Sequence, residues 1–260
     1  MTTGGIIMQI NNCTAIVTGG ASGLGEACVK HIISQGGNAA IFDLDDIKAL
    51  NLVKSLEKNI IFCKTDVSNE ESVESSIQKT IETFEKIHFV INCAGIGTPQ
   101  KILGKNGPVS LDYLTKVIQI NLIGSLNVIR LASEQIVKNN PNEDGERGVI
   151  INTSSIAAYD GQVGQAAYSA SKAGIIGMTL PIAKEFARHG IRVLTIAPGL
   201  FDTPMFAGLP EKAIAALIED IPFPKRLGKP SEFAGLVGHI IENPVLNGET
   251  IRLDCSMRMK

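Results

Sequence analysis

The sequence predicts an α/β protein built on a doubly wound parallel sheet and folded as a single domain over residues 1–260. Short β-branched runs alternate with longer helical stretches from one end of the chain to the other. Alternation of this kind is typical of a parallel sheet with helices on both faces. The short runs are continuously apolar instead of alternating between apolar and polar residues, which favours strands that are buried on both sides.

Strands are expected in the runs that are rich in apolar and β-branched residues: Thr14–Thr18, Asn38–Phe42, Ile60–Lys64, Phe89–Asn92, Gly148–Thr153, Arg192–Ala197 and Thr250–Leu253. Helices are expected between them: Gly23–Ser34, Lys48–Leu56, Glu70–Phe84, Leu111–Lys138, Tyr168–Arg188 and Ser231–Ile241. The polar stretch Lys138–Arg147 is expected to be a solvated loop. For Gly97–Ser110, which follows the fourth strand, a pocket wall and a plain surface loop are equal alternatives.

The composition indicates a globular protein. Of the 260 residues, 44% are hydrophobic and 19% are charged, which excludes an intrinsically disordered chain. The net charge of −2 offers no electrostatic footprint for a polyanion, so we expect no autonomous nucleic-acid binding. No apolar run reaches the roughly 18 to 20 residues that a membrane-spanning helix needs, so no membrane span is expected.

Neither a disulfide framework nor a metal site is expected. The five cysteines are odd in number, widely spaced and never in a C-x-x-C pair, which indicates reduced thiols in an intracellular compartment. The four histidines show no ligand spacing. Met1–Asn12 lacks the apolar core of a secretory signal, which argues against secretion, while an organelle import signal folded into the first strand stays open.

The glycine cluster Thr18–Gly25 lies between the first expected strand and the first expected helix. Glycines let a backbone turn tightly and approach a pyrophosphate, whose charge is then met by the amides of the helix N-terminus. A glycine cluster alone also suits an ordinary tight turn. Its place after the first strand of an alternating chain predicts a dinucleotide site.

Asp43 strengthens this prediction, because it follows the second expected strand and lies 24 residues beyond Gly19. A carboxylate there accepts hydrogen bonds from an adenosine ribose and repels a 2′-phosphate, and the following Leu44 offers no cation to bind one. The cofactor predicted is therefore NAD and not NADP. By itself, Asp43 would be interpreted as a turn residue together with Asp45 and Asp46.

Two further candidates need their structural context. Asp66–Val67 after the third strand and Asn92–Gly95 after the fourth lie where a cofactor would pass, although each alone is equally typical of a turn. Asn121 lies inside the otherwise apolar helical stretch Val117–Leu131 and needs hydrogen-bond partners. It is either satisfied within a helix bend or holds a water that feeds protons to Lys172.

The acid–base candidates are Tyr168 and Lys172, which lie one turn apart if residues 163–180 are helical. A phenol with a pKa near 10 is a poor base at neutral pH, and a neighbouring cation favours its phenolate. Ser155, thirteen residues before Tyr168, would hold a carbonyl or hydroxyl oxygen beside it. These groups are suited to moving a proton while a hydride moves elsewhere.

Together these residues resemble the short-chain dehydrogenase/reductase family over essentially the whole chain. The matching motifs are Thr18-Gly19-x-x-x-Gly23-x-Gly25, Asp66, Asn92-x-Ala94-Gly95, Asn121, Ser155, Tyr168-x-x-x-Lys172 and Pro198-Gly199. Within the family, the segments Gly161–Tyr168, Ile196–Phe201 and Asn247–Asp254 are similar to those of the 3-hydroxyacyl-CoA dehydrogenases.

The resemblance implies a Rossmann fold and an NAD-dependent, mitochondrial homotetramer that acts on short or branched 3-hydroxyacyl-CoA and on steroid alcohols. Its implied catalytic residues are Ser155, Tyr168, Lys172 and Asn121. The implied NAD contacts are Gly19, Ser22, Gly23, Leu24, Gly25, Asp43, Asp66, Val67, Cys93, Tyr168, Lys172 and Phe201. The substrate contacts are Ser155 and Gln165, and no metal is implied.

Two positions depart from the family pattern. Cys93 replaces the second asparagine of the Asn-Asn-Ala-Gly motif, although the 3-hydroxyacyl-CoA dehydrogenases share this cysteine. Cys255 stands where the family has glycine, and because this turn is close to the C-terminus, we expect an effect on subunit packing more than on chemistry.

The segment Phe201–Phe223 combines apolar side chains with proline and glycine, and it is expected to be a lid over the substrate. The alternative is a surface helix packed on the core. Two other functions remain open: a non-catalytic NAD-binding scaffold in a multiprotein complex such as an RNA-processing assembly, and a 3-oxoacyl reductase. Asp43 argues against the reductase, because reductive biosynthesis usually draws on NADPH.

Overall fold

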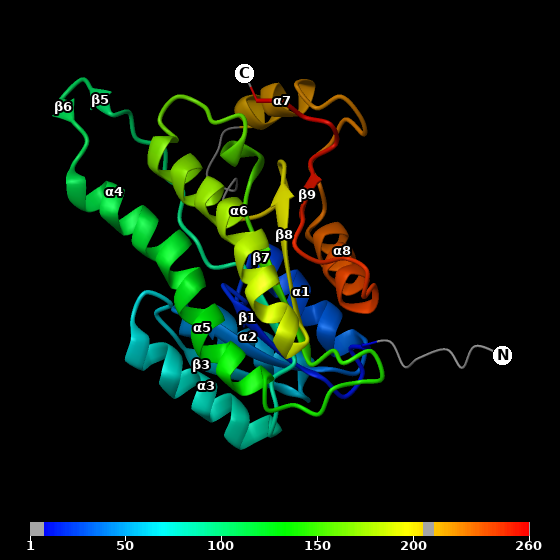
Figure 1. Ribbon diagram of the computed structural model, residues 1–260. Helices are drawn as coiled ribbons and strands as arrows, with labels where there is room; N and C mark the ends of the chain where they lie inside the picture. The colour runs from blue at the N-terminus through cyan, green and yellow to red at the C-terminus, as the bar shows by residue number, and fades with distance from the viewer. Residues whose placement is uncertain (1–7, 205–210, 260) are drawn as a thin grey trace.

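A computed structural model, which describes residues 8–204 and 211–259, has a seven-stranded parallel sheet at its centre (Figure 1). The strand order is β3-β2-β1-β4-β7-β8-β9. The strands are β1 (Thr14–Thr18), β2 (Asn38–Asp43), β3 (Ile60–Lys64), β4 (Phe89–Asn92), β7 (Gly148–Thr153), β8 (Ile191–Pro198) and β9 (Thr250–Leu253). The predicted doubly wound sheet and Rossmann fold are thus confirmed, in one domain.

Helices cover both faces of the sheet (Figure 1). One face packs against α1 (Gly23–Ser34), α2 (Asp46–Leu56) and α8 (Pro230–Glu242). The other face packs against α3 (Glu70–Phe84), α5 (Gly124–Ile136) and α6 (Ala166–Phe186). Each strand therefore buries both of its sides: in β1, Ala15 and Val17 enter the first core and Ile16 enters the second. This is why the strands are continuously apolar.

The long helix expected at Leu111–Lys138 is interrupted. It consists of α4 (Leu111–Ile118), a π-helical turn at Gln119–Ile123, and α5. Such turns are rare and frequently lie at functional sites, and this one carries Asn121. No pattern of apolar spacing distinguishes a π-turn from continuous helix, so the sequence predicted one element.

A hairpin was not expected from the sequence, and a helix within Phe201–Phe223 was the alternative to a lid. The excursion at 97–110 contains a small antiparallel hairpin, β5 (Leu103–Gly104) and β6 (Gly107–Pro108), which projects from the molecule at the upper left of Figure 1. The segment expected to be a lid contains α7 (Glu211–Glu219), whereas residues 205–210 of that segment lie outside the described residues. The hairpin strands have two residues each and are too short for a periodic signal.

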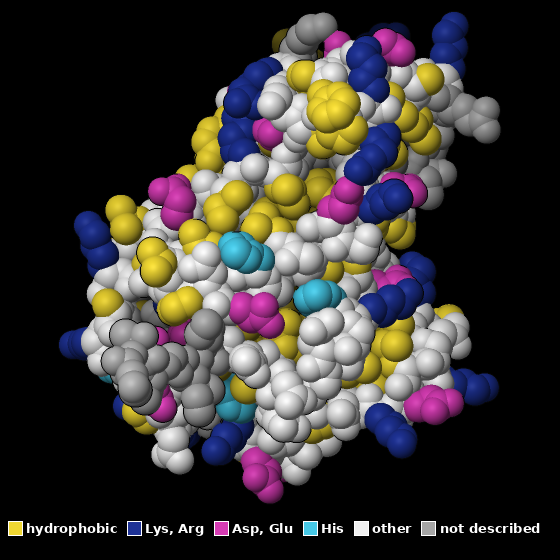
Figure 2. All heavy atoms as spheres, turned by 90° about the vertical axis from the view of Figure 1, so that its right-hand side faces the viewer, with side chains coloured by type: hydrophobic (Ala, Val, Ile, Leu, Met, Phe, Trp, Pro, Cys, Tyr) yellow, Lys and Arg dark blue, Asp and Glu magenta, His cyan; other side chains and the backbone are white. Residues whose placement is uncertain are grey.

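One face of the molecule carries charges of both signs. Figure 2 shows basic and acidic side chains interspersed on the face that includes β9 and α8. Within the part of the chain that the structure describes, no helix has both the length and the apolar character needed to cross a membrane. Over the same residues, no group of three or more His, Cys, Asp or Glu side chains is placed to hold a metal ion.

A buried arginine fixes the end of α8. Arg192, on β8, donates to the carbonyl oxygens of Ile240, Ile241, Asn243 and Leu246 at 2.7–3.2 Å. Its Nε also donates to Glu146 Oε1 at 2.6 Å, and both side chains of this ion pair are only 7% exposed. One guanidinium thus satisfies carbonyls that a helix end leaves without partners.

We predict that Arg192→Ala lowers the free energy of unfolding by about 3–5 kcal/mol, because it leaves a buried carboxylate without its cation and several carbonyls without donors. Urea denaturation at fixed protein concentration measures this change. Arg130→Ala is the matched control, since its ion pair with Glu70 has side chains that are 51% and 59% exposed. The control should cost less than about 1 kcal/mol, and equal losses in the two variants would contradict the assignment.

Candidate functional site

A cavity of about 630 Å³ opens at the carboxyl ends of the central strands. In open parallel sheets this edge, where the strand order reverses direction, is the usual ligand site. Every residue expected to bind cofactor or substrate lines the cavity: Gly19, Ser22, Gly23, Leu24, Gly25, Asp43, Asp66, Val67, Cys93, Ser155, Gln165, Tyr168, Lys172 and Phe201. Asn121 is the one predicted site residue that is not part of its lining.

The glycine loop fits closely against the loop that follows β4. Gly19 has a φ of +64°, and a Cβ added to it would lie 2.9 Å from the Ala94 nitrogen. A Cβ on Gly25 would overlap the Gly19 carbonyl oxygen. Glycine is therefore required at these two positions by the loop's own packing. The result is a concave stretch of backbone at the N-terminus of α1, the arrangement that suits a pyrophosphate.

Asp43 acts both as a turn residue and as part of the cavity wall. Its Oδ1 accepts a hydrogen bond from the Asp45 amide at 3.0 Å, and its Oδ2 accepts one from the Ala21 amide at 3.0 Å. The turn interpretation is thus correct without excluding the cofactor interpretation. The second bond joins the end of β2 to the glycine loop, so the carboxylate is held at the cavity edge.

Asp66 and Val67 lie at the same end of the cavity. Asp66 Oδ1 accepts from the amide and the hydroxyl of Ser68 at 2.9 and 2.6 Å. The Val67 carbonyl oxygen accepts from Asn127 Nδ2 at 3.0 Å. Both residues are held by local bonds, so this wall is fixed by the protein itself.

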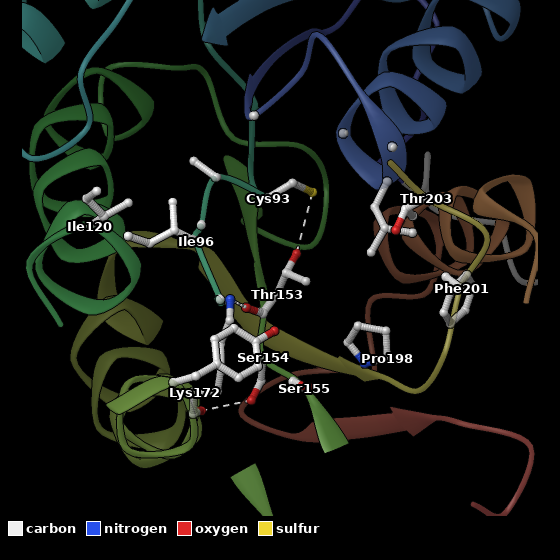
Figure 3. A pocket seen from close by; sticks show the side chains of 18 of the residues that line it. Cys93, Ile96, Ile120, Thr153, Ser154, Ser155, Lys172, Pro198, Phe201 and Thr203 are labelled. Carbon is white, nitrogen blue, oxygen red and sulfur yellow. Dashed lines mark hydrogen bonds between the residues drawn. The ribbon is translucent and has the colours of Figure 1, made fainter. Parts of the chain in front are cut away.

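Tyr168, Lys172 and Ser155 all line the cavity. Figure 3 shows Lys172 and Ser155 at its wall. Tyr168 and Lys172 lie one turn apart on α6, with Lys172 Nζ 5.8 Å from the centroid of the tyrosine ring. Lys172 Nζ donates to the Thr153 carbonyl oxygen at 2.8 Å, which ties α6 to the end of β7. Ser155 lies two residues after the end of β7, within hydrogen-bonding reach of the Tyr168 phenol. The geometry predicted from the sequence spacing is therefore present.

The electrostatics differ from the expectation. Burial raises the pKa of the Tyr168 phenol above its ordinary value, and the hydrogen bond with Ser155 opposes this shift. Burial lowers the pKa of Lys172 to about 8. Desolvation disfavours the charged form of each group. In the protein alone, burial of the phenol thus outweighs the effect expected of the neighbouring lysine, and the pKa of Tyr168 lies above its ordinary value.

Asn121 is fully buried and its side chain is satisfied. Its Oδ1 accepts from the Ile96 amide at 2.8 Å, and its Nδ2 donates to the Ile96 carbonyl oxygen at 2.9 Å and to Ser171 Oγ at 3.0 Å. The side chain is therefore satisfied by protein groups, as in the first of the two alternatives. These partners lie in the loop after β4 and on α6 and not within the helix bend. Asn121 joins the loop after β4 to α6, beside Lys172.

Three predicted contacts have additional structural partners. The Cys93 thiol accepts a hydrogen bond from Thr153 Oγ1 at 3.4 Å (Figure 3). The Phe201 ring packs edge-on against Phe233 with 6.3 Å between centroids. Gln165 Oε1 accepts from the Gln162 amide at 2.9 Å, which steadies the start of α6.

Several wall residues are not among the predicted site residues. Gly97 lies against the Tyr168 ring, since an added Cβ would be 2.9 Å from Cε2. Thr153, Thr203 and Met259 also line the cavity. Gly97 opens the stretch for which a pocket wall was one of two alternatives, and Thr203 belongs to the segment expected to be a lid. Thr153 is close to Ser155 in the chain, whereas no signal in the sequence pointed to Met259.

Comparison with known proteins places the chain in a family. The family model described as short chain dehydrogenase matches residues 13–213. The chain belongs to the short-chain dehydrogenase family. This short-chain dehydrogenase is an oxidoreductase that acts on a small-molecule substrate with a nicotinamide cofactor.

The dehydrogenase has similar relatives across most of its length. It is 49% identical over 253 residues to 3-hydroxyacyl-CoA dehydrogenase type-2 of Drosophila melanogaster, which covers 96% of this chain and 99% of that protein. It is 48% identical over 254 residues to the protein of the same name from Homo sapiens, with 97% of each chain covered. The crystal structure of 3-hydroxyacyl-CoA dehydrogenase type-2 from Mycobacterium avium is 40% identical, with a TM-score of 0.92 over 96% of this chain and 97% of that one.

We predict that Gly25→Ala weakens binding of the reduced nicotinamide dinucleotide at least about tenfold, because the added methyl group overlaps the Gly19 carbonyl and opens the loop. Titration of cofactor fluorescence measures this affinity. Gly235→Ala is the control, since it is also a helical glycine and an added Cβ meets nothing within 4 Å. The control should leave affinity unchanged, and unchanged affinity for Gly25→Ala would place the cofactor elsewhere.

Proposed function

We propose that this short-chain dehydrogenase oxidises short or branched-chain 3-hydroxyacyl-CoA to 3-oxoacyl-CoA with NAD, and that hydroxysteroids are further substrates. The observation that carries the proposal is the placement of Ser155, Tyr168 and Lys172 in one cavity with the glycine loop of a dinucleotide site. The substrate class is supported by the names of relatives that are 48–49% identical.

The chain's residues fit such a cofactor. The concave glycine loop would hold the pyrophosphate, and Asp43 would accept hydrogen bonds from the adenosine ribose. Leu44 follows Asp43 and lines the cavity, so this edge offers a carboxylate and an apolar side chain to a 2′-phosphate. This favours NAD over NADP. When bound, oxidised NAD supplies the hydride acceptor and a positive charge beside Tyr168.

In the proposed mechanism, the substrate hydroxyl lies between Ser155 and Tyr168. The Ser155 hydroxyl orients the substrate oxygen, and Tyr168 removes the hydroxyl proton as the base. Lys172 is held in place by the Thr153 carbonyl, so its ammonium group is positioned to stabilise the phenolate and to bind the nicotinamide ribose. Asn121 is the fourth member of the proposed catalytic set, and it ties the Ile96 backbone to Ser171, the residue before Lys172 on α6.

The segment Phe201–Phe223 is proposed to be the lid of the substrate pocket. Residues 201–204 enter the cavity wall next to the glycine loop, since a Cβ on Gly23 would meet Thr203 and Pro204 at 3.5 Å. The segment then continues to α7, whose final turn packs on a small apolar cluster near the cavity. Phe201–Phe223 would thus cover the substrate and exclude water during the reaction.

The alternative functions have less support. A non-catalytic scaffold would not require Ser155, Tyr168 and Lys172 to line one cavity. A 3-oxoacyl reductase would use NADPH, and the carboxylate of Asp43 disfavours binding of its 2′-phosphate. A mitochondrial location and a homotetramer complete the proposal, on the resemblance to the 3-hydroxyacyl-CoA dehydrogenases.

The reaction is tested with 3-hydroxyacyl-CoA thioesters of several chain lengths and with hydroxysteroids, each carrying deuterium on the alcohol carbon. We expect turnover with the shorter thioesters and direct transfer of the deuterium to NAD, read by mass spectrometry of the reduced cofactor. Hydride transfer predicts this because the label never exchanges with solvent. Inactivity toward every thioester, or label released to water, would refute the proposed function.

For cofactor choice, we predict that Asp43→Ala lowers the preference for NAD over NADP at least about tenfold, equivalent to about 1.4 kcal/mol. The variant removes the charge that repels a 2′-phosphate. The ratio of the two kcat/KM values is the readout, because loss of the Ala21 hydrogen bond weakens both cofactors alike. Asp45→Ala is the control: that side chain caps α2 and does not line the cavity. An unchanged ratio in Asp43→Ala would leave Asp43 as a turn residue only.

A further inference from the structure

The chain reverses direction immediately after β9. Cys255 and Ser256 have φ values of 53° and 61°, a conformation that side chains other than glycine rarely adopt. Asp254 stabilises this turn, because its Oδ1 accepts from the Ser256 amide at 3.1 Å and its backbone carbonyl accepts from the Met257 amide at 2.9 Å. The reversal carries the last residues toward α7, beside which the C-terminus lies in Figure 1.

Arg252 ties this segment to the loop that carries the candidate catalytic serine. Its Nη2 donates to Asp160 Oδ2 at 2.8 Å and to the Met257 carbonyl oxygen at 3.0 Å, and its Nε donates to Asp254 at 2.7 Å. The guanidinium also lies 4.7 Å from the centroid of the Tyr159 ring. Asp160 and Tyr159 follow Ser155 closely in the chain, so one side chain sets the distance between the C-terminal segment and the active-site loop.

The segment closes an apolar cluster at the cavity. Met257 is 2% exposed and packs with Ile156 and Ile221, and Met259 packs on the same cluster. Met259 also lines the cavity, as do Ile156 and Gln165. Ile156 directly follows Ser155, and Ile221 follows α7. Met259 thus lies between the active-site loop and the proposed lid, on the apolar side of the cavity.

We propose that the C-terminal segment Asp254–Met259 forms a wall of the substrate pocket, and that Met259 contacts the acyl chain and sets the preference for its length. A methionine suits this place, because its unbranched thioether adapts to flexible apolar groups. Arg252 is a positioning residue that acts through this segment. The proposal rests on the oxidation of 3-hydroxyacyl-CoA proposed above, and it gives the Cys255 turn a role at the pocket as opposed to one in subunit packing.

The test compares kcat/KM for 3-hydroxydecanoyl-CoA with that for 3-hydroxybutyryl-CoA. Met259→Ala should raise this ratio at least about fivefold, since pocket contacts of a single methylene already discriminate about tenfold or more. Met259→Leu, of similar volume, should restore the original ratio to within about twofold. Val245→Ala is the control, because that apolar side chain is 91% exposed.

The positioning role is tested by Arg252→Gln and, with the arginine retained, by Asp160→Asn. Both should raise KM for the thioester several-fold with KM for NAD unchanged, whereas a general loss of folded enzyme would lower the apparent kcat and leave both KM values as they are. A chain-length ratio that stays the same in Met259→Ala, in an enzyme that turns over thioesters, would overturn the inference. A wild-type enzyme that oxidises no thioester would instead refute the proposed function.

Discussion

The buried hydrogen bond from Lys172 Nζ to the Thr153 carbonyl oxygen is the contact on which the candidate site depends. It anchors an ammonium group that burial would otherwise disfavour. It also fixes α6 against the end of β7, so Tyr168 on the helix meets Ser155 just after the strand. Ser154 adds a second tie, because its hydroxyl donates to the Lys172 carbonyl oxygen at 2.8 Å. The spacing of the three groups is therefore built into the junction of one helix and one strand.

A row of buried polar side chains supports this junction across the sheet. Thr18, Asn92, Asn152 and Thr195 are register partners on β1, β4, β7 and β8. Asn92 donates to Asn152 at 2.9 Å, and Thr18 Oγ1 accepts from the amides of Cys93 and Ala94 at 3.1 Å. Buried polar groups of this kind specify one arrangement when they are paired. Here the bonds made by Thr18 and Asn92 tie together the ends of β1, β4 and β7, which border the cavity.

Much of the fold and of the candidate site was predictable from the sequence, because local rules of helix and strand geometry govern these features. The spacing of Tyr168 and Lys172 follows from helix geometry, and the glycine loop and Asp43 follow from strand ends in a parallel sheet. The pKa of Tyr168 was not predictable, because burial depends on the whole fold. The side chain of Asn121 bonds to Ile96, 25 residues away, and to Ser171, 50 residues away, and only the folded chain brings these residues together. Met259 reaches the cavity through a turn at Cys255. Glycine would have signalled such a turn, because it adopts a positive φ readily, whereas cysteine does not.

The central claim is that Tyr168 is the base of a proton transfer coupled to hydride transfer. Its most direct test is the turnover number of Tyr168→Phe at saturating NAD and substrate, with cofactor affinity measured alongside. A phenyl ring keeps the packing against Gly97 and removes the hydroxyl. We expect turnover to fall by at least about 10²- to 10⁴-fold while cofactor affinity is retained. Turnover close to that of the unmodified enzyme would contradict the account.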